Sequence, residues 1–294
     1  MATSTLDRTV TELRETTGVV YRLLVGFRTF FLTVFGATVA GLLLFPLYIV
    51  FSMALKPSHE FFADPLGPPS ELHLENFVTA WTTGGFSTYV LNSVVVVTVS
   101  LLLLVLISSL AAYALVEFDV PWKNLALLAI IAGFMVPPEV LIAPLFALME
   151  ALGWRNAYRS VIVVYVAFGV PFSVFFIRQY FTTLPGSLAE AARLDGCTEL
   201  QVFSRIYLPM SIPAITTVTV FQFVLYWNEF LYAIVFLTQD SMRTAPAGLL
   251  AFQGAHETDY TLLAAGVIIA AIPSVIVFIA FRNSFVRGFT MGRV

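Results

Sequence analysis

Long stretches of apolar residues recur along this 294-residue sequence, and charged residues interrupt them only at wide intervals. A helix that crosses a membrane needs about 20 consecutive, mostly apolar residues. Apolar residues make up 59% of the chain and charged residues only 11%, so we expect an all-α integral membrane protein with six transmembrane helices. The six windows lie within 29–55, near the C-terminal end of 76–116, and at 124–149, 160–177, 211–237 and 260–281.

The distribution of Lys and Arg predicts which side of the membrane each loop occupies, because cytoplasmic loops carry an excess of these residues. Six spans put both termini on the same side. If that side is the cytoplasm, eleven of the 15 Lys and Arg residues lie inside and four lie outside. The four outside are Lys56, Arg155, Arg159 and Arg243. We therefore expect a multi-pass protein whose termini are both cytoplasmic.

A single membrane domain is the simplest division of the chain, because no internal repeat is visible between the first three spans and the last three. We assign residues 1–28 to a cytoplasmic N-terminal tail and residues 29–294 to the transmembrane domain. The tail either forms an amphipathic surface helix that continues into the first span or is only partly ordered.

A charged segment of about residues 185–209, here called the elbow, separates the fourth and fifth apolar windows on the cytoplasmic side. Ser187 and Glu190 have the S-x-x-E spacing of a capping box, which predicts that a short helix begins there. Gly196 can adopt the left-handed conformation that ends such a helix. The elbow is therefore predicted to turn at this glycine.

Thr198 and Gln201 form a second capping box directly after the turn, so the elbow should continue as a second helix. Helices this short cannot bury much apolar surface by themselves. Either a groove on a partner protein covers that surface, or the elbow packs on its own membrane domain. The apolar residues concerned are Ala191, Ala192, Leu194, Val202, Phe203 and Ile206.

The residue spacing of the elbow resembles the EAA loop of permease subunits in binding-protein-dependent ABC importers. The matching residues are Glu190, Ala191 and Ala192, followed by Gly196, Ile206, Leu208 and Pro209. Further segments resemble the carbohydrate-type permeases, including the smaller maltose-type subunit, over nearly all the chain after the tail. They are AAYAL at 111–115, APLF at 143–146, WNEF at 227–230 and RGFTMG at 287–292. The chain departs from the pattern at Cys197, where a small residue such as alanine is usual.

The resemblance implies that the elbow sits in a groove of a cytoplasmic ABC ATPase and couples it to the membrane domain. Glu190 would cap and orient the elbow, the two alanines after it would permit close approach, and Gly196 would set the turn. The coupling residues implied are Glu190, Ala191, Ala192, Asp195, Gly196, Ile206, Leu208 and Pro209.

The resemblance also implies a set of partners in a prokaryotic plasma (inner) membrane. They are two copies of the ATPase, a second related permease subunit and an extracytoplasmic solute-binding protein. The sequence contains no G-x-x-x-x-G-K-[ST] motif, so it has no Walker A loop to hold nucleotide phosphates. We therefore expect no enzymatic activity and no cofactor on this chain, with ATP and Mg on the partner ATPase. Charge patterning and histidine spacing give no indication of a nucleic-acid partner or a metal site.

Two carboxylates fall inside predicted spans, Glu139 in the third and Glu229 in the fifth. A carboxylate at bilayer depth is costly, so it normally faces protein or water. Pro137 and Pro138 predict that the third span kinks or breaks beside Glu139, which is tolerated next to a cavity. Both glutamates, together with Asn228, either line the translocation path or serve to cap broken helices and join subunits.

The leading hypothesis is the membrane-spanning permease subunit of an ATP-driven ABC importer, which moves a sugar or related polyol from an external binding protein into the cytoplasm. One alternative is a proton-coupled secondary transporter in which Glu139 and Glu229 titrate. The elbow argues against it, because such a carrier needs no surface for a separate motor. A second alternative is an ABC permease for a solute that is not a sugar. A membrane-embedded enzyme has no support, because the sequence shows no nucleophile–base pairing and no metal spacing.

Overall fold

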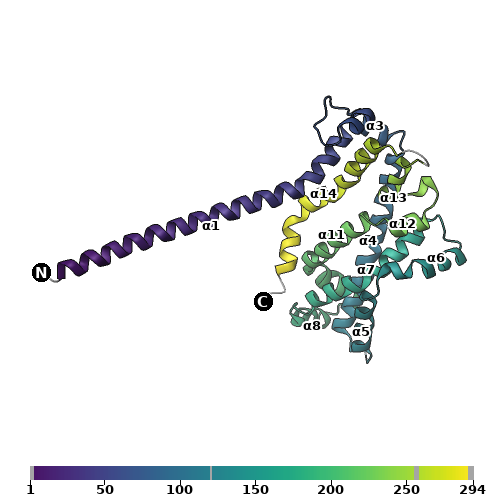
Figure 1. Ribbon diagram of the computed structural model, residues 1–294. Coiled ribbons are helices and arrows are strands. Elements are labelled where there is room, and N and C mark those ends of the chain that lie inside the picture. The colour runs from purple at the N-terminus through teal and green to yellow at the C-terminus, as the bar shows by residue number, and fades with distance from the viewer. Residues whose placement is uncertain (1–2, 120, 255–257, 291–294) are drawn as a thin grey trace.

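The fold is described from a computed structural model, which describes residues 3–119, 121–254 and 258–290, with side chains for 26–119, 121–254 and 258–282. Within these ranges every named element is a helix. Helix α1 (Thr3–Ala54) extends far from the rest of the molecule, and the other helices pack together as one body (Figure 1). The predicted all-α membrane fold is confirmed. The tail is helical and continues into the first span, but its amphipathic character depends on side chains outside the described ones.

Four helical segments are long and apolar enough to cross a membrane, judged by length and composition. They are Gly26–Ala54 of α1, α4 (Phe86–Glu117), α7 (Tyr158–Phe181) and Tyr260–Arg282 of α14 (Tyr260–Thr290). Two further candidates are helix pairs joined by a sharp bend, which gives six spans if each pair counts as one. Helix α5 (Lys123–Phe134) meets the segment Pro138–Ala151 at 88°, and Glu199–Met210 meets α11 (Ile212–Trp227) at 73°.

The third span breaks where the sequence predicted it, since α5 ends before Pro137 and Pro138 begins the short helix η1 (Pro138–Leu141). The fifth window, by contrast, was wrongly expected to be one helix. Helix α11 ends at Trp227, and a separate helix, α12 (Leu231–Phe236), begins after it. The break arises because the Glu229 carboxylate accepts hydrogen bonds from the first free backbone N–H groups of α12.

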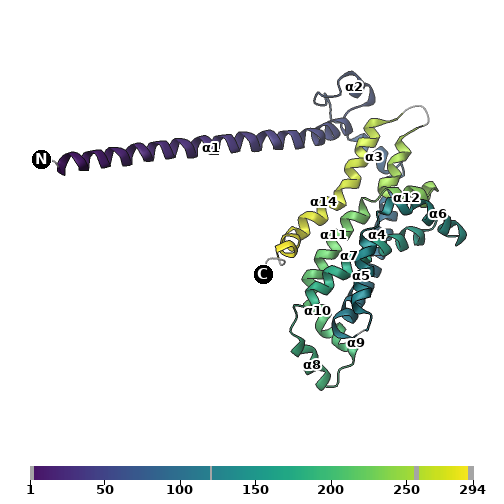
Figure 2. The ribbon, with the colours of Figure 1, turned by 60° about the horizontal axis from the view of Figure 1, so that its bottom comes forward.

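The remaining elements are short, and some of them belong to the two broken spans. They are α2 (Ser58–Ala63), α3 (Glu75–Trp81), α6 (Ile142–Ala151), α8 (Gly186–Leu194), α9 (Glu199–Val202), η2 (Phe203–Tyr207), α10 (Leu208–Met210), η3 (Asp240–Met242), α13 (Ala245–Gly248) and η4 (Leu249–Phe252). Figure 2 shows α8, α9 and α10 at one end of the molecule and α2 at the other. The elbow and the α2 loop therefore lie at opposite ends of the spans.

Helices α4, α7 and α11 form the centre of the molecule. Their buried side chains include Val96 and Leu104 of α4, Val161 and Tyr165 of α7, and Tyr226 of α11. Tyr226 stacks on Tyr165, with ring centroids 4.9 Å apart, and donates a hydrogen bond of 2.6 Å to the Tyr165 carbonyl. This core fixes the three helices against one another, so the segments attached to their ends have defined positions.

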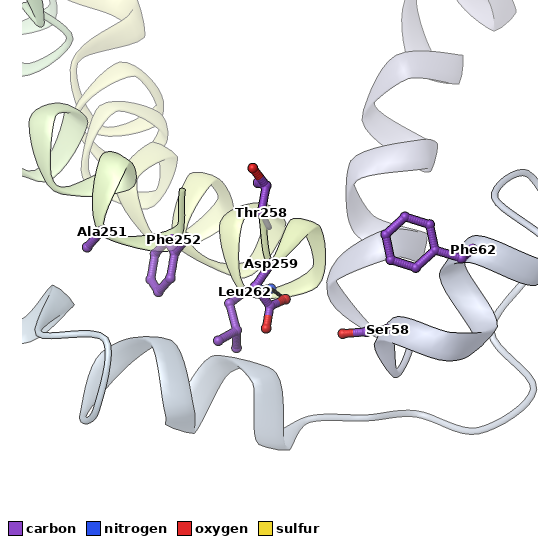
Figure 3. A pocket seen from close by; sticks show the side chains of 7 residues that line it. All are labelled: Ser58, Phe62, Ala251, Phe252, Thr258, Asp259 and Leu262. Atoms are coloured by element: carbon purple, nitrogen blue, oxygen red, sulfur yellow. Dashed lines mark hydrogen bonds between the residues drawn. The ribbon is translucent and has the colours of Figure 1, made fainter. Parts of the chain in front are cut away.

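At the end opposite the elbow, a buried lysine organises the loop that contains α2. Lys56 has no solvent exposure, and its ammonium donates hydrogen bonds to the carbonyls of Asp64, at 2.6 Å, and Gly67, at 2.7 Å. Between this loop and α14 lies a cavity of about 360 Å³ (Figure 3). The cavity is lined by Ser58, Phe62, Ala251, Phe252, Thr258, Asp259 and Leu262. This end of the molecule therefore presents a hollow next to the ends of α1 and α14.

Candidate functional site

The first helix of the elbow starts differently from the sequence prediction. The Ser187–Glu190 capping box is wrong: α8 begins at Gly186, and its N-cap residue is Pro185 with an extended backbone. The fixed φ of proline already ends the preceding turn there, so Ser187 falls inside the first turn of the helix. In the described part of the chain the exposed Glu190 carboxylate accepts no hydrogen bond, so it is available to a partner.

The turn between the two elbow helices is formed as predicted. Gly196 has φ +85°, in the left-handed region. Its N–H donates to the Arg193 carbonyl at 3.0 Å, and the Cys197 N–H donates to the Ala192 carbonyl at 3.0 Å. These two bonds form the Schellman motif that satisfies the last carbonyls of a helix.

The second elbow helix also starts as predicted, with a capping box. The Thr198 N–H donates to Gln201 Oε1 at 2.8 Å, and the Gln201 N–H donates to Thr198 Oγ1 at 3.4 Å. The α9 helix continues through the π-helix η2 into α10, which leads to the sharp bend before α11. The elbow is thus a helix–turn–helix: α8 begins after Pro185, the chain turns at Gly196, and α9 begins after Thr198.

The elbow was expected either to pack on its own membrane domain or to be covered by a partner, and its two faces differ in this respect. Its inner face packs on the membrane domain, where Val202, Phe203 and Tyr207 are buried with Phe181 of α7 and Tyr113 of α4. Its outer face remains uncovered, with Leu194 89% exposed and Leu200 68% exposed. Of the predicted coupling residues, Glu190, Ala191, Asp195, Gly196 and Pro209 are exposed, and Ala192, Ile206 and Leu208 are half-buried.

An ionic cluster joins the elbow to the end of α4, and sequence reasoning missed it. The Arg193 guanidinium donates to Glu199 Oε1, with Nε at 2.7 Å, and also to Glu117 of α4. The Tyr113 hydroxyl donates to Glu199 at 2.6 Å, and the Tyr207 hydroxyl donates to Glu117. No local pattern pointed to Glu117, because it lies 76 residues before Arg193 in the chain.

Glu199 and Arg193 both keep their charges at neutral pH. Hydrogen bonds from Arg193 and then Tyr113 lower the pKa of Glu199 from 4.5 to about 2. Hydrogen bonds to Glu199 and then Glu117 raise the pKa of Arg193 above its ordinary value. The stabilisation from Glu199 is therefore present above its ordinary pKa and is lost only as the pH falls toward 2.

A second candidate site is a cavity of about 360 Å³ at the breaks of the third and fifth spans. Glu139 and Glu229 both line it, so the structure brings together two carboxylates that the sequence singled out separately. The polar residues that line this inner cavity are Glu139, Tyr165, Gln222, Tyr226, Glu229 and Tyr232. Apolar residues, among them Phe134 and Phe168, complete its wall.

Glu229 both lines the inner cavity and caps a helix. It lines the inner cavity, and its carboxylate accepts hydrogen bonds from the Tyr232 N–H at 2.7 Å, the Ala233 N–H at 3.2 Å and the Tyr165 hydroxyl at 2.7 Å. It therefore caps α12 while it faces the cavity.

The other two candidate path residues differ from each other. Glu139 lines the inner cavity, and its carboxylate accepts no hydrogen bond from the residues that the structure describes. Asn228 is not among the lining residues. Its side-chain amide donates instead to the Val224 carbonyl at 2.8 Å and toward Ser274 of α14 at 3.4 Å. Asn228 thus lies at a helix contact, and the cavity carries the two glutamates without it.

Gln222 is the lining residue that sequence reasoning missed, because a search for charges in the spans passes over an uncharged amide. It is only 2% exposed, and its side chain has no hydrogen-bond partner among the described residues. Its amide can therefore form hydrogen bonds with water or a ligand in the cavity.

Comparison with known sequences gives a consistent set of relatives. Residues 105–289 match the family described as binding-protein-dependent transport system inner membrane component. The probable ABC transporter permease protein YurM of Bacillus subtilis is 40% identical over 250 residues, covering 85% of this chain and 83% of the relative. The arabinooligosaccharides transport system permease protein AraQ of Halalkalibacterium halodurans is 36% identical, with 90% and 95% covered. The trehalose/maltose transport system permease protein MalG of Thermococcus litoralis is 35% identical, with 89% and 95% covered.

Comparison with solved structures shows the same fold. A chain in the crystal structure of a bacterial ABC transporter involved in the import of the acidic polysaccharide alginate has a TM-score of 0.73 at 22% identity, covering 86% of this chain and 94% of that one. A chain from the alginate transporter in complex with a periplasmic protein bound to an alginate pentasaccharide has a TM-score of 0.61 at 16% identity, with 87% and 94% covered.

Proposed function

We propose a function on the premise that this chain belongs to the family of binding-protein-dependent transport system inner membrane components. It is the membrane-spanning permease subunit of an ATP-driven ABC importer for a sugar or related polyol. The family match carries this proposal, because residues 105–289 include the elbow, both broken spans and the inner cavity. The chain is a transport subunit and not itself an enzyme. ATP and Mg would bind to a separate ATPase, in keeping with the lack of a Walker A motif in the sequence.

The names of the relatives support a carbohydrate as the solute. AraQ is named for arabinooligosaccharides, and MalG for trehalose and maltose. The inner cavity offers carboxylates, hydroxyls, an amide and aromatic rings, which are groups that suit a polyhydroxylated solute.

Uptake into cells tests the proposed function. Cells that lack the chain should lose uptake of one sugar among labelled trehalose, maltose and arabinooligosaccharides, and the chain supplied in trans should restore it. Depletion of ATP should abolish this uptake, whereas a protonophore applied with ATP held constant should not. Unchanged uptake of every sugar would favour a different solute, and loss with the protonophore alone would favour a proton-coupled carrier.

The exposed face of the elbow is the proposed contact with the cytoplasmic ATPase. Leu194 and Leu200 lie on either side of the Gly196 turn and are not covered by any residue that the structure describes, and Glu190 and Asp195 are also exposed. A photo-crosslinking residue at Leu194 should therefore capture the ATPase subunit. The same residue at Leu72, which is 68% exposed at the opposite end, should not, and capture from Leu72 alone would contradict the assignment.

The apolar surface of α1 supports a second permease subunit. None of its most apolar span window is buried against the other described residues, and Phe27, Phe30 and Leu42 are all more than two-thirds exposed. A helix placed in a bilayer at a distance from its own body is stabilised by packing against another membrane protein. The related permease should therefore co-purify with this chain in mild detergent, together with the ATPase.

The orientation in the inner membrane follows from the positions of the elbow and the positive charges. The elbow and both termini are proposed to be cytoplasmic, which agrees with the eleven-to-four distribution of Lys and Arg. The opposite end, with α2 and the cavity of Figure 3, would face the external solute-binding protein.

A further inference from the structure

The inner cavity has an uneven distribution of charge. Glu139 and Glu229 both line it, and none of its lining residues, all of which are described, is Lys, Arg or His. Glu139 is exposed and Glu229 is half-buried, so both charges lie at the cavity wall, where the effective dielectric constant is lower than in bulk water. The cavity should therefore carry a negative electrostatic potential.

The two glutamates are not equivalent in what they offer to a solute. The Glu229 carboxylate already accepts three hydrogen bonds, from two backbone N–H groups and the Tyr165 hydroxyl. The Glu139 carboxylate accepts none within the described residues, so it can accept hydrogen bonds from solute hydroxyls. Glu139 is thus the acceptor that a solute can reach, while Glu229 adds negative charge nearby.

Gln222 gives independent evidence that a polar solute binds here. Gln222 is only 2% exposed, its amide has no hydrogen-bond partner among the described residues, and it lies in the same wall as the carboxylates. An amide both donates and accepts hydrogen bonds, as a sugar hydroxyl does. The cavity volume of about 360 Å³ lies at the small end of the range of about 300–1,000 Å³ for small-molecule sites, which suits a short part of a saccharide.

We propose that the inner cavity is a subsite that accepts neutral or cationic saccharides and rejects anionic ones. This inference rests on the proposed function and adds a substrate class to it. An acidic polysaccharide such as alginate, for which the structural neighbours are described, is the class that this cavity disfavours despite the shared fold. The negative charge of Glu139 and Glu229 performs the selection, and Gln222 contributes hydrogen bonds without affecting the sign of the potential.

The potential can be measured with charged thiol reagents. The single cysteine, Cys197, is replaced by serine, and Leu225, which lines the inner cavity, is changed to cysteine. The complete transporter is solubilised in mild detergent so that reagents reach both sides. Cationic and anionic methanethiosulfonate reagents of similar size are added, and modification of this chain is followed by mass spectrometry. Each rate is divided by the rate of the same reagent with a free thiol in solution.

The cationic reagent should react faster than the anionic one by about tenfold or more, as expected for two nearby negative charges. Glu139→Gln should lower this ratio several-fold. Glu150→Gln should leave it unchanged, because Glu150 lies on α6 outside the inner cavity and is paired with Arg155. Glu139→Gln is preferred to a change at Glu229, since Glu229 also caps α12.

Two results would overturn the inference. If both reagents reacted at equal normalised rates, or the anionic one reacted faster, the cavity would be open to water but would not select by charge. If neither reagent reacted until the protein was denatured, the cavity would not be on an aqueous path. Sugar uptake by the same cysteine variant, measured in parallel, keeps either result separate from a failure of the proposed function.

Discussion

At the scale of single residues, the lack of a side chain at Gly169 of α7 makes room for Tyr226 of α11 at the centre of the molecule. A Cβ atom at position 169 would lie 2.0 Å from the Tyr226 hydroxyl oxygen and 2.9 Å from a methyl group of Leu104. Because Tyr226 also donates a hydrogen bond to the Tyr165 carbonyl, the ring cannot move without the loss of that bond.

We therefore expect Gly169→Ala to destabilise the protein by about 1–3 kcal/mol, the usual cost of overpacking. Thermal unfolding in detergent should show a lower midpoint. Gly41→Ala is the control, because an added Cβ there has nothing within 4 Å. An equal midpoint for Gly169→Ala and the wild type would show that Tyr226 can move without cost.

A second residue-scale prediction concerns Gly196, whose φ of +85° is poorly tolerated by a β-branched residue. Gly196→Val should destabilise the turn by about 1–2 kcal/mol and reduce the coupling of ATP hydrolysis to transport. Gly186→Ala is a suitable control in the same elbow, since Gly186 lacks a positive φ and has open space around it. Full transport and coupling in the Gly196→Val variant would contradict a role for this turn.

The buried amide of Gln222 leads to a third prediction. Gln222→Leu keeps the approximate size of the side chain but removes its donor and acceptor, so sugar should bind less well while the charge of the inner cavity stays the same. A rise in the KM for uptake of about tenfold is expected, together with an unchanged ratio of thiol-reagent rates. An unaltered KM would mean that Gln222 does not contact the solute.

At the scale of elements, the ionic cluster connects the elbow to α4. Glu117 ends α4 with a side chain only 12% exposed, and Arg193 at the end of α8 pairs with it and with Glu199 of α9. A displacement of the elbow by a partner would therefore pull on a central helix of the bundle. This contact provides a physical connection between the surface element and the spans.

Arg193→Met should remove the ion pair of Glu117 and leave only its hydrogen bond from Tyr207, at a cost of about 1–3 kcal/mol, since a largely buried carboxylate loses its cationic partner. The ratio of ATP hydrolysed to sugar transported should rise, because the elbow is then less firmly attached to α4. Arg205→Met is the matched control: Arg205 is exposed in the same elbow and forms no ion pair with the described residues. If the ratio of ATP hydrolysed to sugar transported were the same in both variants, the cluster would stabilise the elbow without a role in coupling.

At the scale of the whole molecule, the sequence predicts features that depend on composition and on neighbouring residues. The apolar windows, the break at Pro137 and Pro138, and the turn at Gly196 are of this kind. The break in the fifth span was missed because no proline or glycine marks it; it comes from the Glu229 carboxylate capping α12. The Arg193–Glu117 pair was missed because it depends on packing between distant segments.

The candidate site was predictable to a similar extent. Glu139 and Glu229 stood out as carboxylates in apolar windows, but only the fold places them in one cavity. Gln222 became visible only through its burial without a partner. The roles of the two glutamates could not be separated in advance, because a cap and a cavity wall require the same residue type.

The central claim is that a separate ATPase, acting through the elbow, drives solute through this chain. The most direct test is accumulation of labelled sugar in proteoliposomes that contain the purified complex and its external binding protein. The account predicts accumulation against the gradient only when ATP is on the elbow side and the ATPase subunit is present. Accumulation driven by a pH gradient in proteoliposomes without the ATPase would contradict it.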